Sequence, residues 1–266
     1  DINACFISEI FFITEPSALI SSTTQSNFNN FGVSCNGDND GWIDLTVNGG
    51  VDNIAYTYSW SNGETTEDIN TIGANMYSVI ATDANGCPTP QTVVITQADS
   101  ITSSFSTLTW NNYEIQCNGG SNGEITLAVL GGVTALPYSF DIDGASNSTN
   151  VFNNISAGTY TLTATDANGC PTQQTVSMNE PSTAVVSSYT QSNFNNFGVH
   201  CNGDNDGWID LTVNGGIGIH TYSWSNSASS EDLNGIGAGT YSVTATDENG
   251  CITQKTVVIT EPSALI

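Results

Sequence analysis

The residues of this chain that could do chemistry are first of all aspartates, and their spacing recurs. A D-N-D-G motif places Asp38 and Asp40 two residues apart, and the motif returns with Asp204 and Asp206. Closely spaced carboxylates are typical of calcium loops, because a hard cation needs several oxygen ligands. The rest of an EF-hand loop is missing, and Asn, Asp and Gly equally favour a plain turn. Calcium and a structural turn are both open interpretations, and no other cofactor is indicated.

The cysteines are the second reactive group, and they mark a repeating unit of roughly 82 residues. In each unit one cysteine opens a C-N-G motif and another closes an N-G-C motif, while Cys5 is left over. One pair per unit, without any C-x-x-C motif, favours a disulfide over free or metal-binding thiols. The predicted bonds lie within units: Cys35–Cys87, Cys117–Cys170 and Cys201–Cys251.

Trp42 and Trp208 directly follow the two D-N-D-G motifs. Alternation in W-I-D-L-T-V puts Ile, Leu and Val on one face and turns the tryptophan to the other. An outward tryptophan can anchor a glycan or a protein partner. It can also stiffen a sheet by pairing across strands, so both interpretations stay open.

Strands are needed to position these residues. Alternating runs such as 42–47, 56–60 and 77–83 are separated by turns rich in Gly, Asn and Asp. This pattern predicts an all-β chain of tandem immunoglobulin-like sandwiches, each with one disulfide. A glycine-rich approach leads to a tyrosine in every unit, as in the tyrosine corner of such sandwiches: Tyr77, Tyr160 and Tyr241.

Internal repetition sets the expected domain layout. Residues 24–50 recur at 190–216 with a single change, and a weaker copy surrounds Cys117. We expect repeats at 21–98, 99–182 and 183–266, after the last strand of a preceding repeat at 1–20. The apolar run 6–13 is predicted to be a strand that pairs with a preceding repeat or a neighbouring chain.

Charge and the absence of recurring catalytic groups narrow the function. The chain has 26 acidic residues and 1 basic residue, a net charge of −25 that disfavours nucleic acid as a partner. No apolar run is long enough for membrane insertion. Both histidines, His200 and His220, lie in the third unit, so no Ser-His-Asp arrangement can repeat, and we predict no enzyme activity. Disulfides indicate an oxidising location outside the cytoplasm.

Three motifs together resemble the SprB repeat of very large surface proteins in gliding Bacteroidota. They are C-N-G-D-N-D-G-x-I-D-L-T-V-x-G-G, then Y-S-W-S-N, then G-T-Y-x-V-T-A-T-D-x-N-G-C, and they recur over residues 21–266. The resemblance implies an extracellular location at the cell surface, tandem arrays and a role in cell adhesion or in a filament. The second copy departs from it at 117–127, which lacks two aspartates and the tryptophan.

Three positions match glycosylation motifs. Asn147 and Asn154 each begin an N-x-S/T sequon. The sequence D-S-I at 99–101 looks like the O-glycosylation motif of Bacteroidota and would place a glycan on Ser100.

Our leading hypothesis is a structural repeat segment of an extracellular bacterial adhesin or filament that gives reach and stiffness. Its partners would be neighbouring copies of the same repeat array. The alternative is a module that binds surface glycans or a protein through the exposed Trp and Asp face of the first and third repeats.

Overall fold

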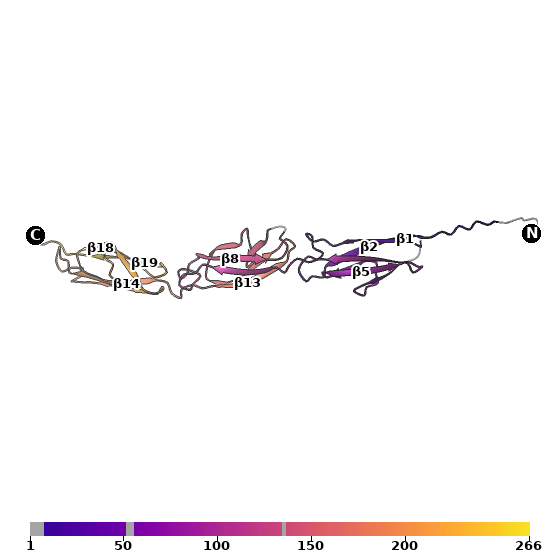
Figure 1. Ribbon diagram of the computed structural model, residues 1–266. Coiled ribbons are helices and arrows are strands. Elements are labelled where there is room, and N and C mark those ends of the chain that lie inside the picture. The colour runs from indigo at the N-terminus through magenta and orange to yellow at the C-terminus, as the bar shows by residue number, and fades with distance from the viewer. Residues whose placement is uncertain (1–7, 52–55, 135–136) are drawn as a thin grey trace, which may run out of the picture. The chain divides into compact units, whose positions relative to one another are not determined.

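The computed structural model of the chain describes residues 8–51, 56–134 and 137–266 (Figure 1). The regular elements among these residues are all β-strands, and none is a helix that could cross a membrane. The chain divides into two compact units: Asp1–Thr102 with Val129–Tyr138 and Thr165–Thr172, and Ser103–Ala128 with Ser139–Ala164 and Gln173–Ile266.

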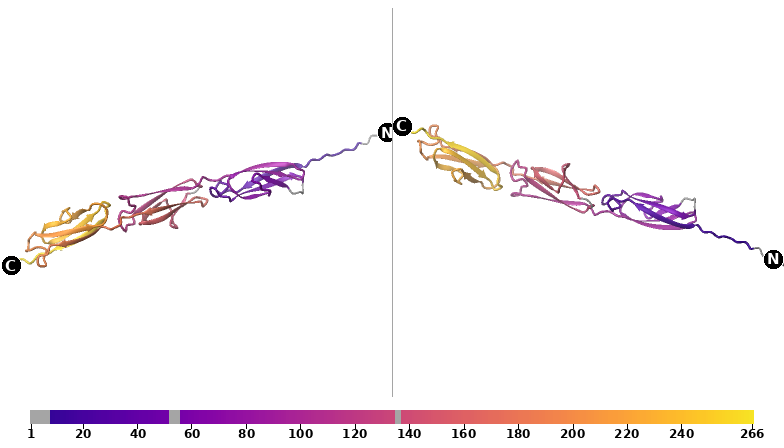
Figure 2. Two further views of the ribbon diagram at one scale, coloured as in Figure 1. Left: turned by 90° about the horizontal axis from the view of Figure 1, so that it is seen from below. Right: turned by 90° about the horizontal axis from the view of Figure 1, so that it is seen from above.

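The first unit contains a sandwich of two antiparallel sheets, with strand orders β1-β2-β4 and β3-β5-β6. Figure 2 shows the two sheets as facing layers. The strands are β1 (Ser17–Gln25), β2 (Gly41–Gly50), β3 (Thr57–Trp60), β4 (Ile69–Ile72), β5 (Asn75–Thr82) and β6 (Pro88–Ile95).

The remaining strands belong mainly to the second unit and form four sheets, ordered β11-β8-β7, β10-β9-β12-β13, β14-β15-β17 and β16-β18-β19. The last two sheets repeat the strand orders of the first sandwich. The strands are β7 (Thr102–Thr107), β8 (Gly123–Leu130), β9 (Ser139–Ile142), β10 (Ala145–Asn147), β11 (Val151–Ile155), β12 (Gly158–Thr165), β13 (Pro171–Met178), β14 (Val186–Gln191), β15 (Gly207–Asn214), β16 (Thr221–Trp224), β17 (Leu233–Ile236), β18 (Gly239–Thr246) and β19 (Ile252–Ile259).

Alternation in β2 explains how a sandwich forms from this sequence. Ile43 and Leu45 are buried, while the residues between them are exposed. They pack in one core with Val79 and Ala81 of β5, which lies in the opposite sheet. Burying each large aliphatic side chain contributes about 1.5–3 kcal/mol. The all-β, immunoglobulin-like fold class is therefore confirmed.

A tyrosine corner closes each sandwich. The Tyr77 hydroxyl donates to the carbonyl of Gly73, four residues upstream, at 3.0 Å. Tyr160 and Tyr241 make the same bond to Ser156 (3.1 Å) and Gly237 (3.0 Å). The glycine-rich segment before each tyrosine thus places a backbone carbonyl within hydrogen-bond distance of the tyrosine hydroxyl on the strand that follows.

The expected boundary between residues 20 and 21 is wrong. β1 begins at Ser17 and pairs with β2 as far as Gly50, so residues 17–20 belong to the first sandwich. The physical reason is Pro16, which has no backbone N–H and so cannot continue a hydrogen-bonded strand. The boundary therefore falls at T-E-P-S, residues 14–17, and not at the serines after residue 20.

The apolar run predicted as a strand over 6–13 is not one in its described part. Residues 8–13 form no strand, and Phe11, Phe12 and Ile13 are 80%, 87% and 97% exposed. Residues 6–7 lie outside the described residues. In the three sandwiches the strands at the equivalent place are β6, β13 and β19. β6 is hydrogen-bonded to β5, and β19 is hydrogen-bonded to β18. No described strand takes the equivalent place beside residues 8–13.

Removing the corner hydroxyl should destabilise its sandwich. We expect Tyr77→Phe to lower the free energy of unfolding of the first repeat by about 1 kcal/mol, because the Gly73 carbonyl loses its donor. Tyr189→Phe in β14 is the control and should change the free energy of unfolding of its own repeat, the third, only a little, because Tyr189 is exposed and its ring contacts Lys255. Denaturant unfolding would measure both, and equal shifts would contradict the corner's role.

Candidate functional site

The cysteines join different repeats. Cys35 bonds Cys170, and Cys117 bonds Cys251, with a Cα–Cα distance of 5.7 Å in each bond. Each bond lies inside one of the two compact units. The three bonds predicted within repeats are therefore wrong: Cys35–Cys87, Cys117–Cys170 and Cys201–Cys251.

Strand length explains this pairing. Cys87 directly precedes β6, and Cys35 lies beside the end of that strand, where the N–H of Val33 donates to the Thr96 carbonyl at 3.2 Å. The eight residues of β6 cover about 26 Å, whereas bonded cysteines need Cα atoms about 5.5–6 Å apart. The two cysteines of one repeat thus lie at opposite ends of a strand and cannot meet.

Two of the described cysteines have no disulfide partner. Cys87 and Cys201 are free and exposed. Cys5, which we expected to be left over, lies outside the described residues.

Asp166 shapes the loop that presents the second cysteine of a bond. Its Oδ1 accepts the N–H groups of Asn168 (3.0 Å) and Cys170 (2.9 Å), and its Oδ2 accepts that of Val133 (2.7 Å). Equivalent aspartates hold the other two N-G-C loops in the same way: Asp83 and Asp247. The carboxylate replaces missing backbone partners, so the cysteine is fixed before it reacts.

An asparagine clasp accompanies the disulfide of the first unit. Asn29 occupies a two-residue turn between Phe28 and Phe31 and has a positive φ of 48°. Its Nδ2 donates to Oδ1 of Asn168 at 2.6 Å, and Nδ2 of Asn168 donates to the Ser34 carbonyl at 2.8 Å. The loop of the second repeat is thereby held against the loop that carries Cys35.

The second unit repeats this clasp around the other disulfide. Asn111 donates to Oδ1 of Asn249, and Nδ2 of Asn249 donates to the Gln116 carbonyl at 3.0 Å. In return, Nε2 of Gln116 donates to the Asn249 carbonyl at 2.6 Å. Asn249 is only 6% exposed. These clasp contacts are amide to amide or amide to carbonyl, so they bring no like charges together.

The C-N-G loop is in turn fixed to the segment that leaves its own repeat. Nδ2 of Asn118 donates to the Pro181 carbonyl at 2.8 Å, and the N–H of Gly119 donates to Oε2 of Glu180 at 2.7 Å. In the first repeat Asn36 donates to the Ala98 carbonyl at 2.8 Å. The cysteine of this loop is therefore also held in a defined place.

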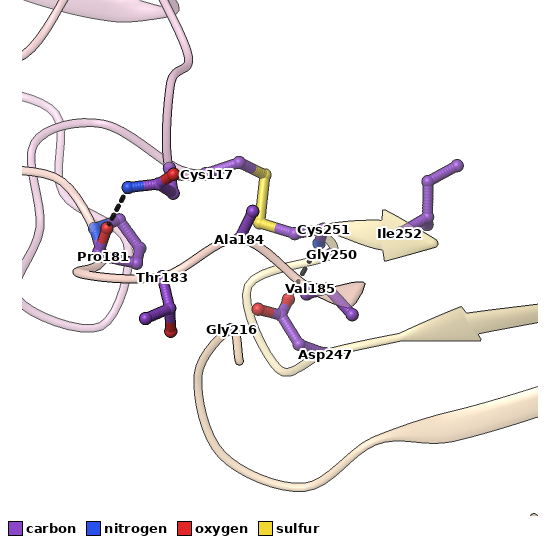
Figure 3. Close-up of a pocket in the computed structure, with 11 residues that line it drawn as sticks. Cys117, Pro181, Thr183, Ala184, Val185, Gly216, Asp247, Gly250, Cys251 and Ile252 are labelled. Atoms are coloured by element: carbon purple, nitrogen blue, oxygen red, sulfur yellow. Dashed lines mark hydrogen bonds between the residues drawn. A yellow bond between two sulfur atoms is a disulfide. The ribbon is translucent and has the colours of Figure 1, made fainter. Parts of the chain in front are cut away.

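A pocket of about 310 Å³ lies beside the Cys117–Cys251 bond. Figure 3 shows the residues that line it. Thr183, Ala184 and Val185 line it from the segment between β13 and β14. The carboxylate of Asp247 also faces it, but this group already accepts the N–H groups of Cys251 and Ile217 at 2.8 Å each. Among its lining residues the pocket has no uncommitted acid or base that could act on a substrate.

The aspartates considered for calcium bind their own loops. Asp40 accepts the N–H of Ser34 at 3.0 Å, and Asp38 accepts its hydroxyl at 3.0 Å. Burial by itself would raise the pKa of Asp40, but the hydrogen bonds from Ser34 and from its own backbone together hold this pKa below its usual value. In the third repeat Asp204 accepts the N–H of Cys201, and Asp206 accepts that of His200. Among the described residues no group of three or more His, Cys, Asp or Glu side chains gathers in one place, and calcium binding at these aspartates stays a prediction.

The two histidines have structural contacts. The ring of His200 stacks on Phe194 with centroids 3.6 Å apart, and its Nδ1 contacts Asp206. Nε2 of His220 bonds the Gly215 carbonyl at 3.0 Å. Tyr56 makes the equivalent bond in the first repeat, where its hydroxyl donates to the carbonyl of a double glycine.

The tryptophans lie on the outer face, as the alternation predicts. Trp42 is 41% exposed and Trp208 is 37% exposed, while their neighbours in β2 and β15 are buried. The equivalent residue in β8 is Glu124. Whether the tryptophans bind a ligand stays a prediction.

The glycosylation candidates differ in their surroundings. Ser100 and Asn154 are exposed. Asn147 is half-buried, and its Nδ2 donates to the Val151 carbonyl at 2.7 Å, a bond that a glycan on this nitrogen would disturb. Modification at these three positions remains a prediction.

Sequence reasoning missed the asparagines of the clasp. A signal for them exists, because an aromatic–Asn–Asn–aromatic turn begins seven residues before each C-N-G cysteine, as F-N-N-F, W-N-N-Y and F-N-N-F. Consecutive asparagines favour the left-handed backbone of a tight turn. Nothing in the pattern indicates that the first of them contacts another repeat.

A family model described as the SprB repeat matches residues 32–65, 114–147 and 199–229. The resemblance drawn from the motifs of the chain is therefore confirmed at these three places. No curated protein sequence matches the chain significantly.

Solved structures with a similar arrangement include a Ca²⁺-stabilised adhesin with which an Antarctic bacterium reaches out and binds ice. It is 15% identical, with a TM-score of 0.41, over 90% of this chain and 73% of that one. Another is the Down syndrome cell adhesion molecule (N-terminal eight Ig domains), 10% identical, with a TM-score of 0.31, over 92% of this chain and 48% of that one. At these scores neither likeness bears on function.

Peptide mapping without reduction should identify the bonds between repeats. We expect linked peptides that contain Cys35 with Cys170 and Cys117 with Cys251, because the Cα atoms of each of these pairs lie 5.7 Å apart. A reduced and alkylated sample is the control and should yield the four peptides singly. Recovery of Cys117 linked to Cys170 would contradict the site.

Proposed function

We propose that this chain, which carries three SprB repeats, is a structural segment of an extracellular bacterial adhesin or filament. It gives reach and stiffness and resists tension, and it performs no catalysis. The observation that supports this most directly is the pair of disulfides that join successive repeats.

The bonds shorten the covalent path along which tension travels. From the N-terminal side the path reaches Cys35, crosses to Cys170, returns along the chain to Cys117 and crosses to Cys251. While both bonds hold, the distance between the two ends of the chain cannot exceed the length of this path. Roughly 100 residues remain extensible, or about 350 Å at full stretch, against about 900 Å for the whole chain.

Each junction also has two covalent connections, the backbone and the disulfide. A cut in the backbone between two sandwiches therefore leaves them joined. Such redundancy suits a protein exposed to force and proteases outside the cell, where disulfides persist. The partners in this role are neighbouring copies of the repeat, with neither nucleic acid nor membrane insertion involved, and no cofactor is required.

Single-molecule stretching between the two ends of the chain tests this function. In oxidising buffer we expect the unfolded length to stop near about 350 Å, and in reductant to approach about 900 Å. Cys35→Ser with Cys117→Ser is the matched variant and should reach the longer value without reductant. Full extension of the oxidised wild-type chain would remove the tension-resisting role.

A second candidate function rests on the exposure of Trp42 and Trp208. A surface glycan could stack on these rings, since exposed aromatics are frequent anchors of interfaces. The second repeat would not take part, because Glu124 replaces the tryptophan there.

A glycan array separates this candidate from a purely structural role. If glycans bind through these rings, Trp42→Ala with Trp208→Ala should abolish retention, because the stacking surface is gone. Glu124→Ala changes the equivalent place in the second repeat and should leave retention unchanged. Retention that survives the double tryptophan variant would rule out this face as the binding site.

A further inference from the structure

The free cysteines Cys87 and Cys201 lie in loops that make the same hydrogen bonds as the loops of bonded cysteines. Asp83 accepts the N–H groups of Asn85 (3.0 Å) and Cys87 (2.9 Å), as Asp166 does in the bonded loop. These donors, led by the Cys87 N–H, hold the pKa of Asp83 below its usual value, so the loop keeps its ionised cap. The N-G-C loop of the first repeat is thus already formed.

Exposure is what distinguishes this loop from its bonded equivalents. Cys170 and Cys251 are 6% and 9% exposed, and Asn249 is buried, because a C-N-G loop covers them. Cys87 and Asn85 are exposed, although their backbone takes the same hydrogen bonds. The N-G-C loop of the first repeat is therefore exposed, although it has the same backbone structure as the covered N-G-C loops of the second and third repeats.

The loop around Cys201 presents the complementary half. Asn202 donates to the Pro262 carbonyl at 3.1 Å, and the N–H of Gly203 donates to Glu261 at 2.8 Å. These bonds match those of the second repeat, where Asn118 and Gly119 bind the segment that follows β13. The C-N-G loop of the third repeat is thus fixed in the bonded form although its cysteine is free.

A groove beside Cys201 corresponds to half of the pocket at a bonded junction. Its walls are the loop and the following segment, with Asn202, Pro262 and Ala264 among the lining residues. At the Cys117 junction the equivalent residues line one side, and the other side comes from the next repeat through Gly216, Asp247 and Cys251. The first repeat holds the same trio as Gly50, Asp83 and Cys87, where a Cβ on Gly50 would lie 2.7 Å from the Asp83 carboxylate.

We propose that the surfaces around Cys201 and Cys87 are the two halves of one further junction, and that each binds the complementary half on another copy of this repeat. Cys201 bonds the N-G-C cysteine of that copy, and Cys87 bonds a C-N-G cysteine. The clasp forms with them, Asn195 taking the place of Asn29 and Asn85 that of Asn168. This inference goes beyond the structural role proposed above and does not require a surface location.

The chemistry needs an oxidant, and a small disulfide such as oxidised glutathione supplies it. One protein thiolate attacks it, forming a mixed disulfide and releasing one glutathione thiol. The other protein thiolate then attacks the protein sulfur of that mixed disulfide and releases the second glutathione thiol. Two protein thiols are oxidised and one small disulfide is reduced. The carboxylate of Asp204 raises the pKa of Cys201, so the reaction should quicken as pH rises above 7.

Two copies of a chain with a net charge of −25 repel each other, so the reaction should also quicken with salt. The clasp does not oppose this, because its contacts use neutral amides and carbonyls. Random collision of exposed thiols would show the same salt effect but no preference for one partner cysteine over another.

A mixing experiment tests that preference in the full chain carrying Cys5→Ser. One protein adds Cys87→Ser and the other adds Cys201→Ser, and both are placed in a glutathione redox buffer. We expect each protein alone to stay largely monomeric and the mixture to give a covalent dimer at least tenfold faster, with Cys87 linked to Cys201 in its peptide map. The Cys5→Ser protein with both cysteines should form a ladder of oligomers.

The clasp gives a second readout. Asn85→Ala in the partner that keeps Cys87 should slow dimer formation several-fold, while Asn153→Ala, at an exposed position in β11, should leave it unchanged. Dimers that form as fast in either protein alone as in the mixture would overturn the proposal. So would an intramolecular Cys87–Cys201 bond in the Cys5→Ser protein, or a mixture that yields no such bond.

Discussion

A disulfide forms only where two Cα atoms come within about 6 Å of each other, and in this chain that approach occurs between repeats. The two cysteines of one repeat are separated by the length of a strand such as β6. Each N-G-C loop therefore has to reach a loop of another repeat. The aspartate cap, the asparagine clasp and the bonds of Asn36 and Asn118 to the following segment all serve this approach, because they fix both loops in position.

Charge limits the ways in which such a junction can be built. With 26 acidic residues and 1 basic residue, the chain has almost no cations to pair across an interface. The described clasps are made from side-chain amides and backbone carbonyls, whose hydrogen bonds contribute about 0.5–1.5 kcal/mol each without bringing charges together. The disulfide holds two repeats together where the chain has too few basic residues to form salt bridges between them. A strongly acidic surface can thus coexist with close contacts between repeats.

Much of the fold could be predicted from local pattern. Alternation located β2 and β15 and turned Trp42 and Trp208 outward, because side chains in a strand point to opposite faces in turn. The glycine-rich approach to Tyr77 predicted its corner hydrogen bond. The D-N-D-G motif was ambiguous, since the same carboxylates that could bind calcium also cap a loop, as Asp38 and Asp40 do with Ser34. Only contacts in three dimensions separate those two uses.

By itself the sequence determined the repeat, most of the strands, the resemblance to the SprB repeat and the acidic composition, since each of these depends on residue types at short range. It did not determine which cysteines meet. Equal spacing made Cys117–Cys170 and Cys35–Cys170 equally consistent with one cysteine pair per repeat, because both follow the same period. Tertiary structure decided between them by placing the C-N-G loop where a repeat ends and the N-G-C loop where the next one begins. The clasp between Asn29 and Asn168 follows from the same placement, since 139 residues separate its two members along the chain.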